Sequence, residues 1–294
     1  MPGPASVTAW TPHPDVWLLV AVFAVGYWMA VERVGRRVVT PGTPVVTRAQ
    51  VVAWSLGCVA LWLSSDWPVH DVAEGSMYSV HMVQHLMITL LVVPLFLLGT
   101  PAWLARWVLA PGSRRFAVVR SCSRFLPAVI VFNVMLALTH IPALVNASAE
   151  NGLLHFGVHA ALFLTAFVVW MPVLSPLPEI PRLSWLMRMV YLFLQSIIPT
   201  VPASFMTMGD APLYKHYVGL TNLWGLSTLE DMQIAGLIMK IGAGMFTWAL
   251  IATIFFRWAA DEERRQRPQV RRALERELEQ IAAGPGSTAA VRDA

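Results

Sequence analysis

Apolar residues in this chain gather into seven long runs, and the connections between the runs hold most of the charged residues. The third run, from Met77 to Gly99, is almost wholly apolar after its first turns and is long enough to cross a bilayer as a helix. The first two runs are shorter than the others. We therefore predict an all-α fold, a bundle of seven transmembrane helices. The predicted helices cover residues 16–31, 50–64, 77–98, 125–141, 152–174, 186–206 and 232–257.

The composition agrees with a polytopic membrane protein. Hydrophobic residues make up 56% of the 294 residues and charged residues 13%, whereas a soluble domain carries roughly 25% charged residues. We expect a transmembrane domain over residues 1–258, with no cleaved signal peptide, and a charged cytoplasmic tail over residues 259–294. This tail is predicted to be helical in part, broken near Pro268 and disordered from Gly284.

The distribution of basic residues predicts the orientation of the bundle. All basic residues except Lys215 and Lys240 lie in the connections 32–49, 99–124 and 175–188 or in the tail from Arg257. The connections on the other side of the bundle carry acidic residues and a single lysine, Lys215. Because connections rich in arginine and lysine stay in the cytoplasm, the N-terminus is expected outside and the C-terminus inside.

The same orientation places every histidine on the outer side of the membrane. His81 and His85 are spaced four apart in the third predicted helix, and His155 and His159 repeat this spacing in the fifth. Each pair is therefore expected on one helical face. His140 ends the fourth helix at the same depth. For the three histidines in connections, hydrogen bonding is the simpler interpretation: His13, His70 and His216.

The helical histidines are candidate metal ligands. Met77 precedes His81 by four residues and is expected on the same face, with Gln84 beside it. Imidazole and thioether suit copper, and a thioether favours Cu(I). The two cysteines, Cys58 and Cys122, form no CxxC motif, so thiolate copper chaperoning and a disulfide framework are not expected. The alternative is that these histidines are interfacial anchors or hydrogen-bonding groups between helices.

The last predicted helix adds polar residues near its outer end. Lys240 lies about 12 Å beyond Met232, at a rise of 1.5 Å per residue. At that depth it can snorkel, pair with an acid such as Asp231, or serve a function. Five side chains are candidates for supporting the metal ligands or contacting a partner: His140, Gln84, Asp231, Gln233 and Lys240.

The chain contains three motifs: Ser79-Val80-His81-Met82-Val83-Gln84-His85 with a span ending in Leu98-Gly99-Thr100-Pro101, then Met208-Gly209-Asp210-Ala211-Pro212-Leu213-Tyr214, and Asp231-Met232-Gln233-Ile234-Ala235-Gly236. Together they resemble the signature of the CtaG-type cytochrome c oxidase assembly factors, over about residues 15–258. The resemblance implies a multi-pass protein that takes part in the maturation of a haem-copper oxidase at its copper centres.

The resulting hypothesis is a non-enzymatic assembly factor in a bacterial cell membrane, which binds or presents copper, as Cu(I), at the outer face. Expected partners are cytochrome c oxidase subunits and membrane lipid, and not nucleic acid. Three alternatives stay open: a haem-binding electron carrier with axial histidines, a metal transporter, which the apolar inner halves of the spans disfavour, and a metal-free scaffold for oxidase subunits. The expected ligands are His81, His85, His155 and His159, with Met77 as an additional soft ligand.

Overall fold

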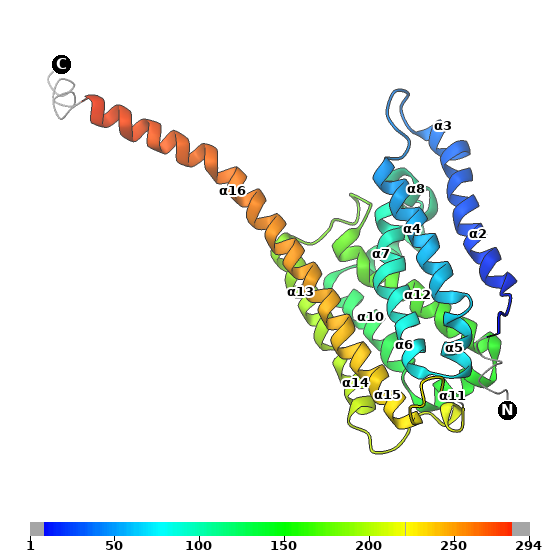
Figure 1. Cartoon of the computed structure of the whole chain (residues 1–294). Coiled ribbons are helices and arrows are strands. Elements are labelled where there is room, and N and C mark those ends of the chain that lie inside the picture. Colours follow the sequence, from blue (N-terminus) through cyan, green and yellow to red (C-terminus); the bar gives the residue numbers. More distant parts are fainter. Residues whose placement is uncertain (1–8, 221, 284–294) are drawn as a thin grey trace.

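The computed structural model describes residues 9–220 and 222–283, and every regular element in these ranges is helical. The segment from Gly284, predicted to be disordered, lies outside the described residues. The helices form an elongated bundle from which the last helix projects (Figure 1). In chain order the elements are α2 (Pro14–Met29), η1 (Ala30–Gly35), α3 (Arg36–Val38), α4 (Arg48–Ser65), α5 (Val69–Gly75), α6 (Tyr78–Leu86), η2 (Met87–Val92), α7 (Val93–Gly99), α8 (Ala102–Leu109), α9 (Arg114–Cys122), α10 (Phe125–Leu138), α11 (Pro142–Glu150), α12 (Gly152–Leu174), α13 (Trp185–Ile197), α14 (Thr200–Thr207), η3 (Lys215–Tyr217), α15 (Thr228–Leu237), η4 (Ile238–Gly242) and α16 (Ala243–Ala283).

All seven predicted runs form helices, but not all of them reach the length and hydropathy of a membrane span. The second run corresponds to α4, which has 18 residues and begins at the charged Arg48. The fourth corresponds to α10, which has 14 residues and counts as a sixth span only together with α9, from which it is bent by 88°. Five helices among the described residues are long and apolar enough to cross a membrane: Pro14–Val38, Tyr78–Gly99, Gly152–Leu174, Trp185–Thr207 and Thr228–Glu279.

Local sequence signals explain where several helices begin and break. Thr47 and Gln50 form a capping box at the start of α4, in which each side chain satisfies a backbone N–H group of the other residue. The Asn151 side chain accepts hydrogen bonds from two backbone N–H groups in the first turn of α12. The sixth run is interrupted between α13 and α14 at Pro199, because proline has no backbone N–H to donate.

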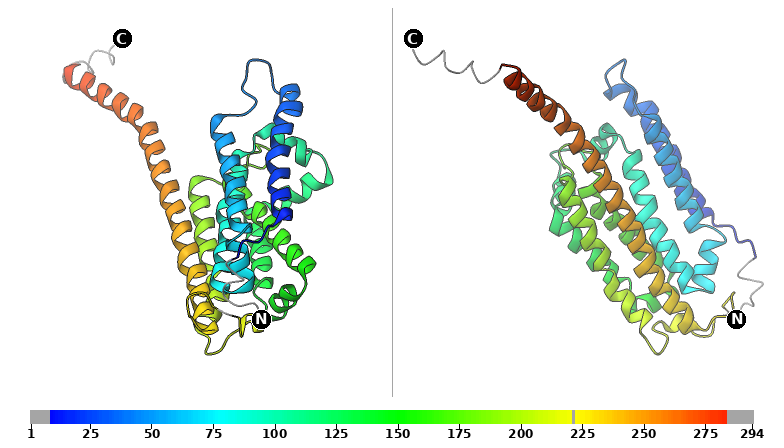
Figure 2. Two further views of the ribbon diagram at one scale, coloured as in Figure 1. Left: turned by 45° about the vertical axis from the view of Figure 1, so that its right-hand side comes forward. Right: turned by 60° about the vertical axis from the view of Figure 1, so that its left-hand side comes forward.

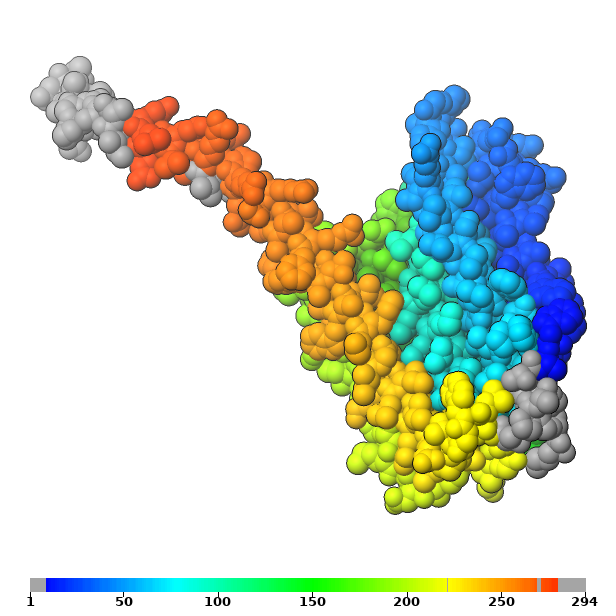
Figure 3. Space-filling model, in the orientation of Figure 1, coloured from blue at the N-terminus to red at the C-terminus, as the bar shows by residue number. Residues whose placement is uncertain are grey.

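The charged C-terminal part of the chain is a direct continuation of the last apolar helix. α16 leaves the body of the bundle and extends away from it (Figures 2 and 3). The predicted break near Pro268 is wrong, because α16 continues through this residue up to Ala283. Ion pairs between residues four apart favour a continued helix on both sides of the proline: Arg267 with Glu263, and Arg271 with Glu275.

α6 is held at one end of the bundle by contacts with α5 and α15. Its residues Tyr78 and Met82 are buried with Tyr214 and Met232 in one apolar cluster. The π-helical turn η2 follows α6 directly, and α12 packs against η2 and α7. Because the third predicted helix is packed in this way against its neighbours, side chains on the turns of α6 have defined positions relative to α12.

Candidate metal centre

Four imidazoles from α6 and α12 meet at one end of the bundle. Figure 1 shows α5 and α6 at this end. The ring centroids of His81 and His85, one turn apart on α6, are separated by 4.3 Å. Those of His155 and His159 on α12 are separated by 4.4 Å. Between the helices, the His85 and His159 rings are 4.6 Å apart and their Nε2 atoms 3.4 Å apart. The two predicted pairs therefore face each other.

These side chains form two overlapping groups of donor atoms. One ring nitrogen each of His81, His85 and His159 lies within 4.8 Å of the others. A carboxylate oxygen of Glu74 and ring nitrogens of His155 and His159 form the second group within the same limit. His159 belongs to both groups. The arrangement therefore offers either three imidazoles, or two imidazoles and a carboxylate, to a metal ion.

Glu74, near the end of α5, lies close to ring nitrogens of two of the histidines. Its Oε1 lies 3.1 Å from Nδ1 of His81 and 3.3 Å from Nε2 of His155. Burial alone would raise the pKa of the Glu74 carboxyl, but the hydrogen bond from His81 and the charges of neighbouring imidazoles lower this pKa to about 2. An ionised carboxylate only accepts hydrogen bonds. The His81 ring therefore donates from Nδ1 to it, and in the neutral ring this leaves Nε2 of His81 as a lone-pair donor.

A small cavity lies between the imidazoles. Its volume is about 20 Å³, and its wall includes Glu74, Tyr217 and the four helical histidines. A cavity of this size holds one occupant of the size of a water molecule, and a haem does not fit. The ring nitrogen Nδ1 of His85 is buried and has no hydrogen-bond partner among the described residues. The site therefore combines a cavity large enough for one ion with a buried imidazole nitrogen that has no hydrogen-bond partner among the described residues.

Asp231 fixes the start of the helix that carries His81 and His85. Its side chain, 2% exposed, comes from α15 and accepts a hydrogen bond from the backbone N–H of Tyr78 at 2.6 Å. It also accepts hydrogen bonds from the backbone N–H and the hydroxyl of Ser79. Met77, which occupies the N-cap position of α6, provides no cap from its own side chain. A carboxylate from another helix thus satisfies the first turn of α6 and stabilises its N-terminal dipole.

The histidines in connections have hydrogen-bonding partners outside the cluster. His13 Nε2 lies 2.8 Å from a carboxylate oxygen of Asp71. The amide of Gln84 lies 3.4 Å from Nδ1 of His70, and Nε2 of His216 lies 3.4 Å from a backbone carbonyl of α5. These contacts agree with the interpretation of the three residues as hydrogen-bonding groups, and they place Gln84 between α6 and α5 rather than in the donor groups.

Met77 is not on the helical face that its spacing predicts. The residue is fully buried, but its backbone is extended, with φ −136° and ψ 118°, because α6 begins only at Tyr78. The spacing of four residues before His81 therefore does not stack the two side chains. Met77 is not among the described residues that line the cavity between the imidazoles. Its role as a soft ligand stays a prediction.

The other predicted supporting residues have separate positions. Lys240 is exposed on η4, and the carboxylate of Asp231, one of its possible partners, binds the start of α6 instead. Gln233 donates a hydrogen bond to the backbone carbonyl of Gly209 at 3.3 Å, which holds the loop after α14. His140 is buried, and its Nδ1 donates to the carbonyl of α10 residue Leu136 at 2.7 Å. His140 Nε2 has no hydrogen-bond partner in the described part of the chain.

Glu74 is the residue of the site that the sequence motifs do not reveal. In the sequence it is one of several acidic residues in the connections that carry few basic residues, seven positions before His81. It reaches the imidazoles because the short helix α5 packs against α6. The available signal is a carboxylate close in sequence to a histidine pair, which is the combination seen where a carboxylate orients a metal-binding imidazole.

Comparison with known proteins identifies related sequences. Residues 25–261 match the family model described as cytochrome c oxidase caa3 assembly factor. The chain is 24% identical over 285 residues to an uncharacterized protein of Mycobacterium leprae (strain TN). That alignment covers 90% of this chain but 42% of the relative, so the chain spans about two fifths of the relative's length. No solved structure matches the chain.

Proposed function

The chain belongs to the cytochrome c oxidase caa3 assembly factor family, and we propose that it holds copper, as Cu(I), at the histidine cluster for delivery to a haem-copper oxidase. The observation that carries this proposal is the convergence of three imidazole nitrogens, from His81, His85 and His159, within 4.8 Å. Family membership supports a role in oxidase assembly. The choice of copper rests on the chemistry of the donors.

The donor set fits copper better than a hard cation. Imidazole is a borderline ligand suited to copper and zinc, whereas magnesium and calcium take oxygen donors. Neutral imidazole is the metal-binding form, and in a neutral His81 ring the hydrogen bond from Nδ1 to Glu74 leaves Nε2 available to a metal. Copper is the cargo in this proposal, so the site must also release it. One turn of α12 away, His155 and Glu74 form the second donor group with the shared His159, which offers a neighbouring position during transfer.

The membrane arrangement of the proposal follows the charge distribution. We propose an external N-terminus and a cytoplasmic C-terminus, an orientation in which the histidine cluster lies at the outer face of a bacterial cell membrane. In this arrangement the cluster faces the side on which oxidase subunits would receive copper. The protein acts without catalysis, as a carrier that contacts one or more subunits of the oxidase.

The test replaces His81 and His85 together with alanine and measures oxidase activity in cells. Alanine is the best helix former, and two polar groups leave the bilayer, so the variant should accumulate normally. We expect oxidase activity to be lost and to recover in part when copper is added to the medium. His13→Gln, at the same end of the molecule but outside both donor groups, is the matched control and should keep full activity.

A metal-free scaffold gives a different set of results. If the histidines only pack the bundle, the double variant should be less abundant, and oxidase activity should fall in proportion to that abundance. Normal abundance with full oxidase activity would refute the role of this histidine pair in assembly. Normal abundance with lost activity, and no copper bound to the wild-type protein, would replace the copper proposal with the scaffold.

A further inference from the structure

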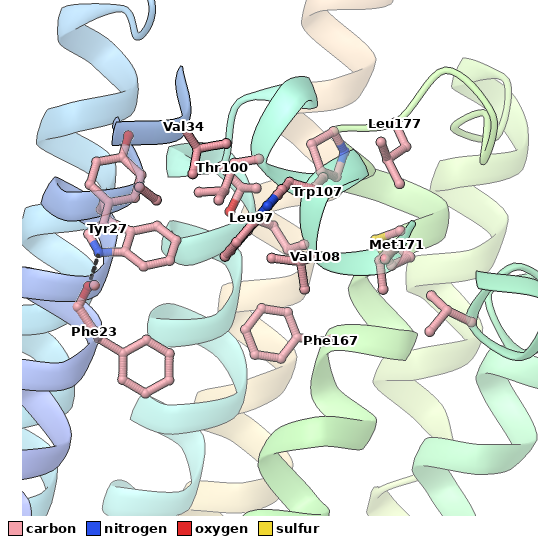
Figure 4. Close-up of a pocket in the computed structure, with 18 of the residues that line it drawn as sticks. Phe23, Tyr27, Val34, Leu97, Thr100, Trp107, Val108, Phe167, Met171 and Leu177 are labelled. Atoms are coloured by element: carbon pink, nitrogen blue, oxygen red, sulfur yellow. Dashed lines mark hydrogen bonds between the residues drawn. The ribbon is translucent and has the colours of Figure 1, made fainter. Parts of the chain in front are cut away.

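A second, much larger cavity lies at the other end of the bundle. It has a volume of about 860 Å³, is partly open, and is lined by α2, η1, α4, α7, α8, α9, α12 and the segment that follows α12. Figure 4 shows Val34 and Trp107 towards one end of this cavity and Phe23 and Phe167 towards the other. None of its lining residues belongs to the histidine cluster. We name it the inner cavity.

The wall of the inner cavity is mostly apolar, and three of its polar side chains form hydrogen bonds within the wall. The Tyr27 hydroxyl donates to the backbone carbonyl of Gly99 at 3.0 Å. The Trp54 indole N–H donates to the carbonyl of Phe23 at 3.2 Å, and the Thr100 hydroxyl donates to a carbonyl one turn before it. These donors already have acceptors in the protein, so they need no hydrogen bond from a ligand. The remaining surface suits a hydrocarbon chain.

One lining residue, Arg33, is a cation without an acidic partner. Two neighbouring arginines are paired: Arg36 lies 2.6 Å from a carboxylate oxygen of Glu32, and Arg106 lies 2.7 Å from one of Glu179. Arg33 is exposed and forms no ion pair with any described residue, although it lines the cavity. It directly precedes Val34 and thus lies at the end of the cavity nearest the arginine-rich connections, which we call the arginine-rich face.

We propose that the inner cavity binds one anionic phospholipid, with an acyl chain along the apolar wall and the phosphate on Arg33. The volume lies in the range of ligand pockets, roughly 300–1,000 Å³. The guanidinium group binds phosphate through paired hydrogen bonds. An apolar space that ends at an unpaired cation matches a molecule with a hydrocarbon chain and an anionic head. The lipid comes from the leaflet at the arginine-rich face.

Gly26 of α2 gives a direct way to fill this space. It lines the inner cavity, and a Cβ atom added to it meets no heavy atom within 4 Å. Gly26→Leu therefore extends into the cavity without a backbone clash. Gly244 of α16 is the matched control, since its added Cβ is equally free and it does not line the cavity. Arg37, exposed and also absent from the lining, is the control for Arg33.

The experiment is native mass spectrometry of the full chain, purified in mild detergent from membranes that contain zwitterionic and anionic phospholipids. We expect the wild-type protein to retain one anionic phospholipid. Gly26→Leu should lose it, and Arg33→Gln, an exposed change that leaves the core intact, should retain about fivefold less, as expected for the loss of one ion pair. Gly244→Leu and Arg37→Gln should retain lipid as the wild type does.

Several outcomes overturn the proposal. These are absence of bound lipid from the wild type, equal retention by the wild type and both cavity variants, and equal loss in the control variants. A neutral polyprenyl compound or quinone in place of a phospholipid overturns it as well, because such a molecule needs no phosphate contact. If Gly26→Leu does not fold, Arg33→Gln against Arg37→Gln still decides the result.

Discussion

The capping of α6 by Asp231 leads to a quantitative prediction. Asp231→Ala removes the acceptor for the backbone N–H of Tyr78 at 2.6 Å and for two donor groups of Ser79. Hydrogen bonds to charged groups contribute about 1.5–3 kcal/mol each, and loss of an N-cap costs about 1 kcal/mol. The buried carboxylate also carries a desolvation cost, which offsets part of the gain. We expect a net destabilisation of about 3 kcal/mol.

The assay is thermal unfolding of the purified protein in detergent. For a chain of this size 1 kcal/mol corresponds to about 2–4 °C, so Asp231→Ala should lower the unfolding midpoint by about 6–12 °C. Asp231→Asn keeps the shape of the side chain and one acceptor oxygen, so it should lower the unfolding midpoint by about half as much. Glu230→Gln, an exposed change in the neighbouring capping box of α15, is the control. A midpoint of Asp231→Ala equal to that of the control would refute the role of Asp231 as the cap of α6.

Three further results are expected. Cysteines introduced at His81 and His159, whose rings are 5.5 Å apart, should crosslink readily, and failure of every such pairing between the two histidine pairs would leave them as separate sites. Burial would raise the pKa of Asp66, but hydrogen bonds from two tryptophan indoles and a backbone N–H lower this pKa overall. The ionised carboxylate therefore contributes its full stabilisation above the ordinary pKa of 3.8, and the contribution is lost as pH falls below that value. Asp66→Asn should reduce the dependence of the unfolding midpoint on pH in this acid range. Reporter fusions at Pro111 should be cytoplasmic and those at Asp71 external, and the opposite pattern would contradict the placement of the cluster at the outer face.

The sequence predicts the positions of the helices because an apolar run of membrane length has few alternatives to a helix. The interruption at Pro199 also has a local cause, the missing backbone N–H of proline. Pro268 is the counterexample, since α16 continues through it. Whether a proline ends a helix depends on how strongly the residues around it favour the helix. The proline alone therefore does not predict where the helix ends.

The histidine pairs are visible in the sequence because a spacing of four places two side chains on one helical face. The sequence alone does not show that α6 starts after Met77, because this boundary is set by Asp231, a residue 153 positions after Tyr78. It also does not show that Glu74 joins the imidazoles, since that depends on the packing of α5 against α6. Long-range contacts thus define the parts of the site that local patterns miss.

The central claim is that imidazoles bind copper between α6 and α12. The most direct measurement is X-ray absorption at the copper edge of the purified protein, loaded with one equivalent of Cu(I) under reducing conditions. The account predicts bound copper with a shell of nitrogen or oxygen ligands that is lost in the His81→Ala/His85→Ala double variant and kept in His13→Gln. Failure of the wild-type protein to retain copper, or an unchanged copper shell in the double variant, would contradict it.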